Sequence, residues 1–507
     1  MFPINGTILQ YFHWYIDADL MLWNQVKNNA QELVNAGITA LWLPPACKSF
    51  NIQQPGRCWD DTGYNIYDLF DLGEFDQKDG IRTRYGTRQQ YLEAIQTAHE
   101  AGLQVYADVV FHHKNGGDIP EIGKAVPVAW DNRNYEMSLP KQIKIYSHFN
   151  FPGRREKYSK MKWHWQHFDA VNHNAYNWED DSVYRLKNKQ FKTPIDPRHG
   201  NESFLMACDI DTSNQEVQQE LKNWGKWFLK LTEINGFRLD AVKHIDPGFV
   251  KHWLDEIRYN SPQELFTVGD FWSHDVEALH QYIALTEGRL SLFDLPLHYN
   301  FHLASHIGQS YDMRKILDRT LMQQQPTLAV TFVENHQSQP LRALESVVEP
   351  WFKPLAYAII LLREEGYPCI FYPDYYGAHY VDRGYEIWMA SHRWLIDKFL
   401  YARQHYGYGK QLNYFNHPDR IGWTRLGNLK HPQAMAVLLS NGPGGSQWME
   451  VAQPNTQFYD FTEHITEPVY TNEQGWGNFH CNGGSVSVWL QSLDEIHSHR
   501  INLNLSL

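Results

Sequence analysis

The most informative stretch of the chain is Gly236-Phe-Arg-Leu-Asp-Ala-Val-Lys-His244. Its apolar residues predict a buried strand, yet Arg238 and Asp240 stand two positions apart within it. In an extended strand this spacing places both side chains on the same face. A guanidinium in that position holds a nucleophilic carboxylate ionised, although for an isolated pair a structural ion pair is the simpler interpretation.

Apolar runs of strand length recur along the chain with amphipathic stretches between them, which is typical of βα units. Eight such runs predict an α/β fold, namely a closed (β/α)8 TIM barrel. Helix ends agree, because Thr87 to Gln90 resembles a capping box and Gly102 and Gly37 stand at C-terminal caps. The runs are Ile8–Tyr15, Ala40–Pro45, Val105–Val110, Phe237–Val242, Phe266–Phe271, Leu290–Leu297, Leu328–Val333 and Cys369–Pro373.

Two segments depart from the barrel pattern. About a hundred residues separate the third run from the helix before the fourth, far beyond ordinary loop lengths. After Tyr414 short alternating runs such as Ser485 to Leu490 replace the helical periodicity. We therefore expect a catalytic barrel at 1–112 and 202–413, an inserted lobe (domain B) after strand 3 at 113–201, and an all-β C-terminal β-sandwich domain at 414–507.

Composition excludes several classes of partner. The net charge is -13 with 20% charged residues and no long basic block, so we expect no nucleic acid and no anionic membrane surface. No run approaches the roughly 18 to 20 apolar residues of a membrane span. Five widely spaced cysteines predict reduced thiols, and the first residues lack a basic segment followed by an apolar one, so we expect a cytoplasmic protein.

Aromatic residues make up 15% of the chain. Part of this content is expected to form stacking surface for flat, hydroxylated ligands, and ordinary core packing accounts for it equally well.

Polar residues follow several of the predicted strands, where a barrel builds its active site. They are Asp108 and His112-His113 after the third run, Arg238 and Asp240 in the fourth, Asp270 after the fifth, and Glu334-Asn-His-Gln337 after the seventh. Converging carboxylates without a phosphate-binding loop or an H-E-x-x-H motif indicate acid/base and nucleophilic chemistry on an uncharged substrate. Glycoside hydrolysis fits this description.

The chain resembles the α-amylase family of glycoside hydrolases over its whole length, particularly the bacterial cytoplasmic or liquefying type. The resemblance implies retaining hydrolysis of α-1,4-glucans such as starch, glycogen and maltodextrins, with an α-glucan oligo- or polysaccharide as the partner. The motifs that carry it are Gln10–Trp14, Gly63–Phe75, Asp108–His113, Gly236–Asp240, Val268–Trp272, Phe332–Gln337 and Cys481–Trp489.

The resemblance also implies roles for single residues. Asp240 is the nucleophile, and Arg238 keeps it ionised. The remaining implied roles concern the substrate: Tyr64 stacks on a sugar, His113 and His336 bind its hydroxyls, and Lys243 and His244 extend the cleft on the leaving-group side.

Two catalytic positions depart from the family pattern. Asp270 stands where the family carries its general-acid Glu, which shortens the arm by one C–C bond, about 1.5 Å. Gln337 stands where the family carries a second Asp, and losing one electrostatic stabiliser costs on the order of 10² to 10³ in rate. Glu334 is a poor substitute, because three residues along an extended segment it lies on the opposite face.

The family's calcium site, which joins the lobe to the barrel, is altered as well. His112 stands at an Asn position and Ser203 at an acidic one, whereas Asp209 and the His244 carbonyl remain. Since calcium prefers about six to eight oxygen ligands, we expect its site to be absent or much weakened, and we expect no other cofactor.

Two functions therefore stay open. One is an α-1,4-glucan hydrolase or transglycosylase of reduced or altered activity that uses Asp240 and Asp270. The other is a catalytically inactive α-glucan-binding or regulatory homologue. An unrelated barrel enzyme that shares only the fold is a third alternative, to which the ordered motifs leave little room.

Overall fold

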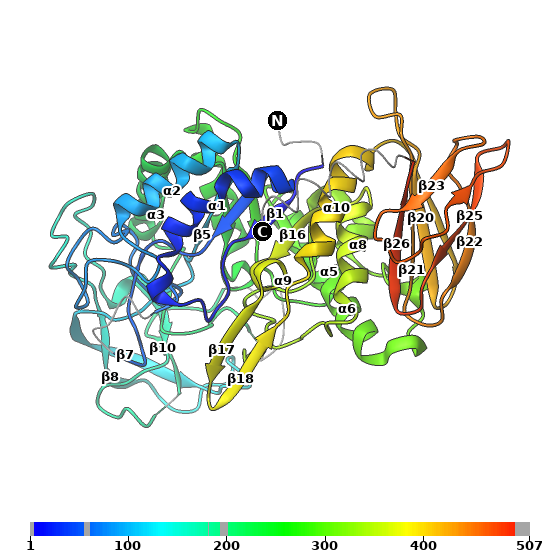
Figure 1. Ribbon diagram of the computed structural model, residues 1–507. Helices are drawn as coiled ribbons and strands as arrows, with labels where there is room; N and C mark the ends of the chain where they lie inside the picture. Colours follow the sequence, from blue (N-terminus) through cyan, green and yellow to red (C-terminus); the bar gives the residue numbers. More distant parts are fainter. Residues whose placement is uncertain (1–4, 55–60, 181, 193–200, 492–507) are drawn as a thin grey trace. The chain divides into compact units, whose positions relative to one another are not determined.

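A closed parallel barrel forms the centre of the fold in the computed structural model, which describes residues 5–54, 61–180, 182–192 and 201–491. Eight described strands follow one another around it in the order β1-β16-β15-β14-β13-β12-β5-β2 (Figure 1). The predicted (β/α)8 barrel is confirmed, and each predicted run overlaps one strand. The strands are β1 (Ile8–Gln10), β2 (Ala40–Leu43), β5 (Gln104–Val109), β12 (Gly236–Leu239), β13 (Phe266–Gly269), β14 (Ser291–Phe293), β15 (Ala329–Phe332) and β16 (Tyr367–Phe371).

The chain divides into two compact units. Among the described residues, the first unit comprises 14–32 and 40–293, and the second comprises 5–13, 33–39 and 294–491. The first contains the paired strands β2, β5, β12, β13 and β14. The second contains β15, β16 and β1, which also pair in parallel. Each unit therefore holds an uninterrupted series of barrel strands.

Helix boundaries follow the local end signals. Thr87 and Gln90 form the predicted capping box of α2, and Gly102 ends that helix with a φ of 99°. Gly37 follows α1 with a φ of 105°, a conformation that costs glycine little. The helices are α1 (Leu22–Ala36), α2 (Arg88–Ala101), α3 (Gln215–Thr232), α4 (Pro247–Tyr259), α5 (Val276–Leu285), α6 (Leu295–Ile307), α7 (Leu321–Gln324), α8 (Lys353–Leu362), α9 (Tyr372–Tyr376) and α10 (Arg393–Tyr406).

An antiparallel sheet lies in the chain between β5 and β12, so the predicted insertion after strand 3 is confirmed. Its described strands follow the order β6-β11-β9-β10-β7-β8. The sheet includes β11, which lies beyond residue 201, and the domain boundaries stay a prediction. The strands are β6 (His113–Lys114), β7 (Ile119–Val128), β8 (Lys141–His148), β9 (Phe168–Val171), β10 (Val183–Leu186) and β11 (Cys208–Ile210).

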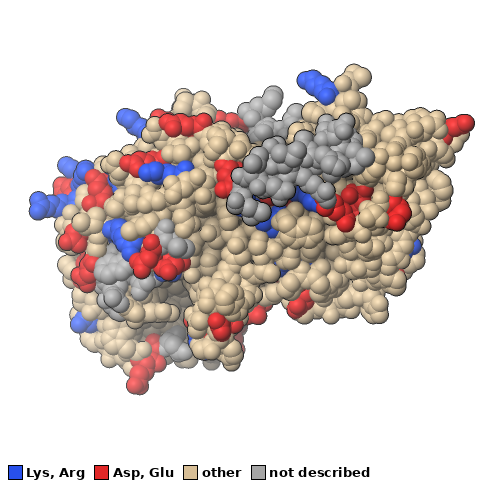
Figure 2. All heavy atoms as spheres, viewed as in Figure 1, with Lys and Arg blue, Asp and Glu red and all other residues tan. Residues whose placement is uncertain are grey.

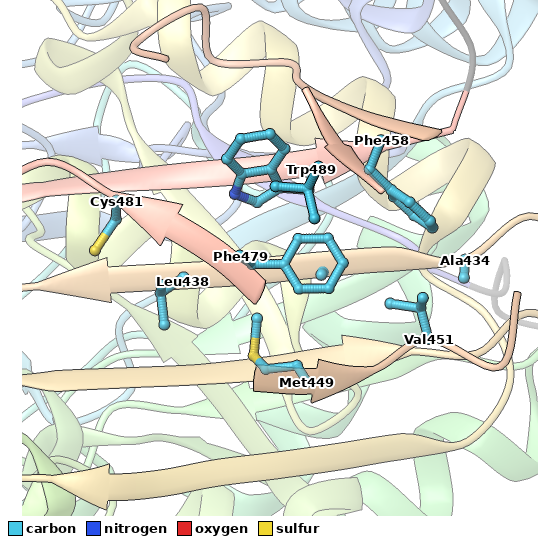
Figure 3. Close-up of a cluster of buried hydrophobic side chains, with 10 residues drawn as sticks. Ala434, Leu438, Met449, Val451, Phe458, Phe479, Cys481 and Trp489 are labelled. Carbon is cyan, nitrogen blue, oxygen red and sulfur yellow. The ribbon is translucent and has the colours of Figure 1, made fainter. Parts of the chain in front are cut away.

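The C-terminal part of the second unit is all-β, as predicted (orange to red in Figure 1). Its larger sheet has the order β19-β20-β21-β26-β23-β24, and β22 pairs with β25. Alternating apolar residues form a fully buried cluster that includes Leu438, Met449, Phe458, Phe479 and Trp489 (Figure 3). The strands are β19 (Gln411–His417), β20 (Arg420–Arg425), β21 (Met435–Ser440), β22 (Gly445–Glu450), β23 (Gln457–Asp460), β24 (Val469–Tyr470), β25 (Trp476–Cys481) and β26 (Ser485–Leu490).

Two smaller predictions bear on the chain's environment. Cys47, Cys208, Cys369 and Cys481 are buried free thiols, whereas Cys58 lies outside the described residues. None of the helices formed by the described residues combines the length and the apolar character that crossing a membrane requires.

We expect Phe479→Ala to destabilise the C-terminal domain by about 3 to 5 kcal/mol, because it removes a fully buried ring and leaves a cavity. Trp448→Ala is the matched control: Trp448 lies on β22, the partner of the strand that carries Phe479, and is 55% exposed. Its effect should stay within about 0.5 kcal/mol. Denaturant unfolding of both variants measures the difference, and equal losses would contradict this account of the core.

Candidate active site

One buried arginine binds three carboxylates in the first unit. Arg238 on β12 donates from Nη1 to Asp108 Oδ1 at 2.9 Å and to Asp240 Oδ1 at 2.5 Å. Its Nη2 donates to Asp270 Oδ2 at 2.5 Å. The four side chains are at most 8% exposed, and we call them the Arg238 cluster. The predicted pairing of Arg238 with Asp240 is thus present, and Asp270 joins it.

Parallel strand register brings the cluster together. Asp240 and Asp270 each follow the last residue of a strand, β12 and β13 respectively. Their amides continue the ladders, since Asp240 N donates to the Val109 carbonyl at 2.8 Å and Asp270 N to the Leu239 carbonyl at 2.9 Å. Ala241 then takes a left-handed φ of 50°, an unusual conformation for alanine that turns the chain out of the strand.

Asp108 has the most crowded surroundings in the cluster. Besides Arg238, its Oδ2 accepts hydrogen bonds from the Tyr64 hydroxyl at 2.8 Å and from Trp42 Nε1 at 3.0 Å. Burial, together with the neighbouring charge of Asp240, raises the pKa of Asp108 to about 7 despite the opposing effect of Arg238. Asp108 therefore exchanges a proton close to neutral pH.

Tyr64 stands at the edge of this group and forms part of an aromatic surface. Its ring lies parallel to Trp14, with centroids 5.6 Å apart and an interplanar angle of 15°. His113 braces it, because His113 Nε2 is 2.9 Å from the Tyr64 carbonyl. Burial lowers the pKa of His113 to about 4, so the imidazole is neutral. The predicted stacking by Tyr64 suits this geometry, and the sugar contact of His113 stays a prediction.

Lys243 and His244 both contact Glu202. Lys243 Nζ forms an ion pair with the Glu202 carboxylate, and His244 Nδ1 contacts the Glu202 carbonyl. Lys243 Nζ also donates to the Trp272 carbonyl at 3.4 Å. Both predicted cleft residues therefore tie the turn after β12 to Glu202.

His336 and Gln337 belong to the second unit, in the loop after β15. His336 is buried, and its Nδ1 lies 3.1 Å from Gln10 Nε2 on the end of β1. The backbone N–H of Gln337 donates to Asn335 Oδ1 at 2.8 Å, which shapes the loop as a tight turn. Their roles at the substrate stay predictions.

Glu334 serves the interior of the second unit. Its Oε2 accepts from Lys353 Nζ at 2.9 Å and its Oε1 from the Val348 amide at 2.7 Å. Lys353 also donates to Asp374 Oδ1 at 2.5 Å. This buried network agrees with the expectation that Glu334 is no substitute for the missing Asp.

The residues for which the resemblance implies calcium binding include nitrogen groups. His112 Nε2 lies 3.2 Å from Asp209 Oδ1 and 3.3 Å from the Ser203 carbonyl. Burial lowers the pKa of His112 and raises that of Asp209. Neither oxygen of Asp209 accepts a hydrogen bond from the described residues, so this carboxyl retains capacity to bind a cation or a proton.

A lysine supplies a cation at the same place. Lys192 Nζ lies 3.3 Å from Asp169 Oδ2 and donates to the Ile210 carbonyl at 3.1 Å. The charges of Asp209, Asp169 and Asp211 raise the pKa of Lys192 against the effect of burial. Calcium takes about six to eight oxygens. With an ammonium and an imidazole among them, the described residues do not fit calcium.

Several of these residues were not predicted as site residues. The sequence predicts Asp108 only as a polar residue at a strand end. Its place in the Arg238 cluster follows from its register opposite Arg238. The spacing of residues in the sequence does not predict a role for Trp42, Glu202 or Lys192, because their contact partners lie far away in the sequence.

A (β/α)8 barrel with carboxylates grouped past the ends of neighbouring parallel strands defines a class, the carboxylate-dependent glycoside hydrolases of barrel fold. Residues 26–393 match the family model "Alpha amylase, catalytic domain", and the chain belongs to this family.

Relatives and solved structures agree with this assignment. The chain is 49% identical to an α-amylase of Geobacillus stearothermophilus over 497 residues, covering 96% of this chain and 87% of the relative. It is 41% identical to the cytoplasmic α-amylase of Escherichia coli (strain K12), covering 96% and 99%. The α-amylase of Geobacillus thermoleovorans complexed with acarbose is similar in fold, with a TM-score of 0.63, 16% identity and coverage of 96% and 99%.

We expect Asp108→Asn to flatten the pH dependence of stability between pH 6 and 8. The folded-state pKa of Asp108, about 7, exceeds the value of about 3.9 in an unfolded chain, so folding binds its proton and stability is lost as pH rises through 7. The wild type should lose on the order of 1 kcal/mol more than the variant. Urea unfolding at both pH values tests this, and identical losses would refute it.

We expect Lys192→Met to destabilise the protein by on the order of 3 kcal/mol, because it leaves the buried carboxylate of Asp169 without its paired cation. Lys187→Met, at an exposed lysine nearby, is the control and should be close to neutral. Calcium added to the metal-free wild type should leave the melting temperature unchanged. A rise in the wild type that Lys192→Met abolishes or enlarges would show that the site holds calcium after all.

Proposed function

We propose that this chain is a retaining α-1,4-glucan hydrolase of the α-amylase type, with activity lowered at two catalytic positions. The observation that carries the proposal is the Arg238 cluster, in which Asp240 and Asp270 flank one guanidinium. Retaining hydrolysis needs two carboxyl groups about 5 to 5.5 Å apart, one as nucleophile and one as acid. Two carboxylates on the two terminal nitrogens of one guanidinium suit that requirement.

Asp240 is the nucleophile in this proposal. Its carboxylate attacks the anomeric carbon and forms a glycosyl ester as the glycosidic C–O bond breaks. Arg238 keeps Asp240 ionised by charge pairing. Asp270 gives its proton to the departing oxygen and then accepts one from the water that hydrolyses the ester.

The contact between Arg238 and Asp270 lowers the expected rate. A general acid must carry a proton, whereas a guanidinium at 2.5 Å favours the ionised carboxylate. The aspartate arm is also shorter than the family's glutamate by about 1.5 Å. Gln337 adds a further loss, because a neutral amide does not stabilise a developing positive charge as a carboxylate does.

The same contact favours a second candidate function. If Asp270 stays ionised and bound to Arg238, the cleft still presents Trp14, Tyr64 and polar groups to a glucan but lacks a proton donor. Such a protein is a non-catalytic α-glucan-binding or regulatory homologue.

Substrate and location follow the relatives. The acarbose complex of one structural neighbour and the α-amylase names of the relatives support an α-glucan as the partner. The cytoplasmic α-amylase of E. coli supports a cytoplasmic location. On the face in Figure 2 the described acidic and basic side chains are interspersed, and with a net charge of -13 this supports a neutral substrate over a polyanion.

The double variant Asp270→Glu, Gln337→Asp tests the proposal on soluble starch. It restores the longer acid and the second carboxylate, so we expect the rate of reducing-end release to rise by about 10² or more. Asp240→Asn in either background should abolish turnover. No gain in the double variant would contradict the assigned cause of the low activity.

The wild type separates the two candidate functions. Slow release of reducing ends that disappears in Asp240→Asn supports the hydrolase. Calorimetric binding of maltoheptaose without any turnover, unchanged in Asp240→Asn, supports the binding protein.

A further inference from the structure

Three potential metal ligands meet in the inserted lobe, apart from the Arg238 cluster. They are Glu121 on β7, His148 at the end of β8 and His164 before the 3-10 turn Trp165–His167. One ligand atom from each lies within 4.8 Å of the other two. We call these residues the lobe triad, and nothing in the proposed hydrolysis uses them.

The backbone directs the triad to one place. β7 and β8 pair with a register irregularity, because Ile119 lies opposite His148 but Glu121 lies opposite Ile145. Such a bulge re-aims a side chain in an antiparallel pair. Phe149 pairs with Trp163 in an isolated bridge, which brings His164 back beside the end of β8.

The distances suit a small divalent ion. His164 Nδ1 is 3.1 Å from Glu121 Oε1, and the rings of His148 and His164 are 4.2 Å apart at 34°. With metal–ligand bonds of about 2.0 to 2.2 Å, neighbouring ligands of a tetrahedral zinc ion lie about 3.4 Å apart. Partial exposure of all three residues leaves room for the imidazoles to adjust and for a water as fourth ligand.

A second layer of contacts orients the carboxylate. Glu121 Oε2 accepts hydrogen bonds from the Ser147 hydroxyl at 2.7 Å and from the Trp165 amide at 2.9 Å. These donors hold one oxygen, so the other faces His164. Metal-binding carboxylates are commonly oriented in this way.

The ligand set selects the kind of ion. Two imidazoles and one carboxylate match zinc and similar transition metals, whereas calcium requires mostly oxygen.

We propose that Glu121, His148 and His164 form a zinc-type metal site with an open fourth position. A bound ion there joins β7, β8 and the segment that leads to Trp165, and so stabilises the lobe. This inference is independent of glucan hydrolysis.

Titration of the purified full chain with Zn²⁺ alone, after removal of metals by a chelator, tests the proposal. We expect one ion to bind with micromolar or tighter affinity and to raise the melting temperature. His148→Gln and His164→Gln should each weaken binding by about tenfold or more. Ca²⁺ should not bind at this site.

His379→Gln is the matched control. His379 Nε2 also lies 2.9 Å from a carboxylate, that of Glu386, but the pair lacks a second imidazole ligand among the described residues. This variant should bind Zn²⁺ like the wild type. A visible d–d spectrum of Co²⁺ in the wild type, displaced by Zn²⁺, gives evidence that does not depend on how a variant folds. Absence of wild-type binding, or full binding by a His148→Gln, His164→Gln double variant, would overturn the proposal.

Discussion

The charge of one buried guanidinium, that of Arg238, is the constraint on which this site depends. It is the cation that Asp108, Asp240 and Asp270 share in the interior of the first unit. Buried carboxylates without a counter-ion are costly, so the strands β5, β12 and β13 must keep the register that brings them to Arg238. Three carboxylates face one guanidinium, so the negative charges exceed the positive one. Burial raises the pKa of Asp108 to about 7, and a proton on this carboxyl reduces the excess negative charge.

In the proposed hydrolysis, the contact with Arg238 favours the nucleophile and disfavours the general acid. A nucleophile benefits from a guanidinium beside it, because the ionised form is the reactive one. A general acid loses by it, because it must arrive protonated. Asp270, the acid of this proposal, accepts a hydrogen bond from Arg238 Nη2, and a neighbouring cation favours the ionised form of a carboxyl group. In the proposed hydrolysis, the altered residue therefore has a shorter reach and lies against a cation.

The sequence predicted the fold more completely than the contacts of the site. Strands such as β5 and β13 were predictable because buried parallel strands read as continuous apolar runs, and α2 because its cap is local in sequence. The proximity of Asp240 and Asp270 followed from the predicted fold, because each residue directly follows one of two neighbouring strands. The contact of Lys192 with Asp169 was not predictable, because it joins a loop lysine to a strand of the lobe by side-chain direction alone.

By itself, the sequence determined the barrel, its insertion, the all-β C-terminal part and the types of residue at the strand ends. These follow from periodicity, caps and motif order, which are properties of neighbouring residues. Only the tertiary structure decided that Asp270 pairs with Arg238, that burial raises the pKa of Asp108 to about 7, and that Lys192 pairs with Asp169. Pairing and protonation depend on distances and burial between residues remote in the chain, and only the folded chain sets those quantities.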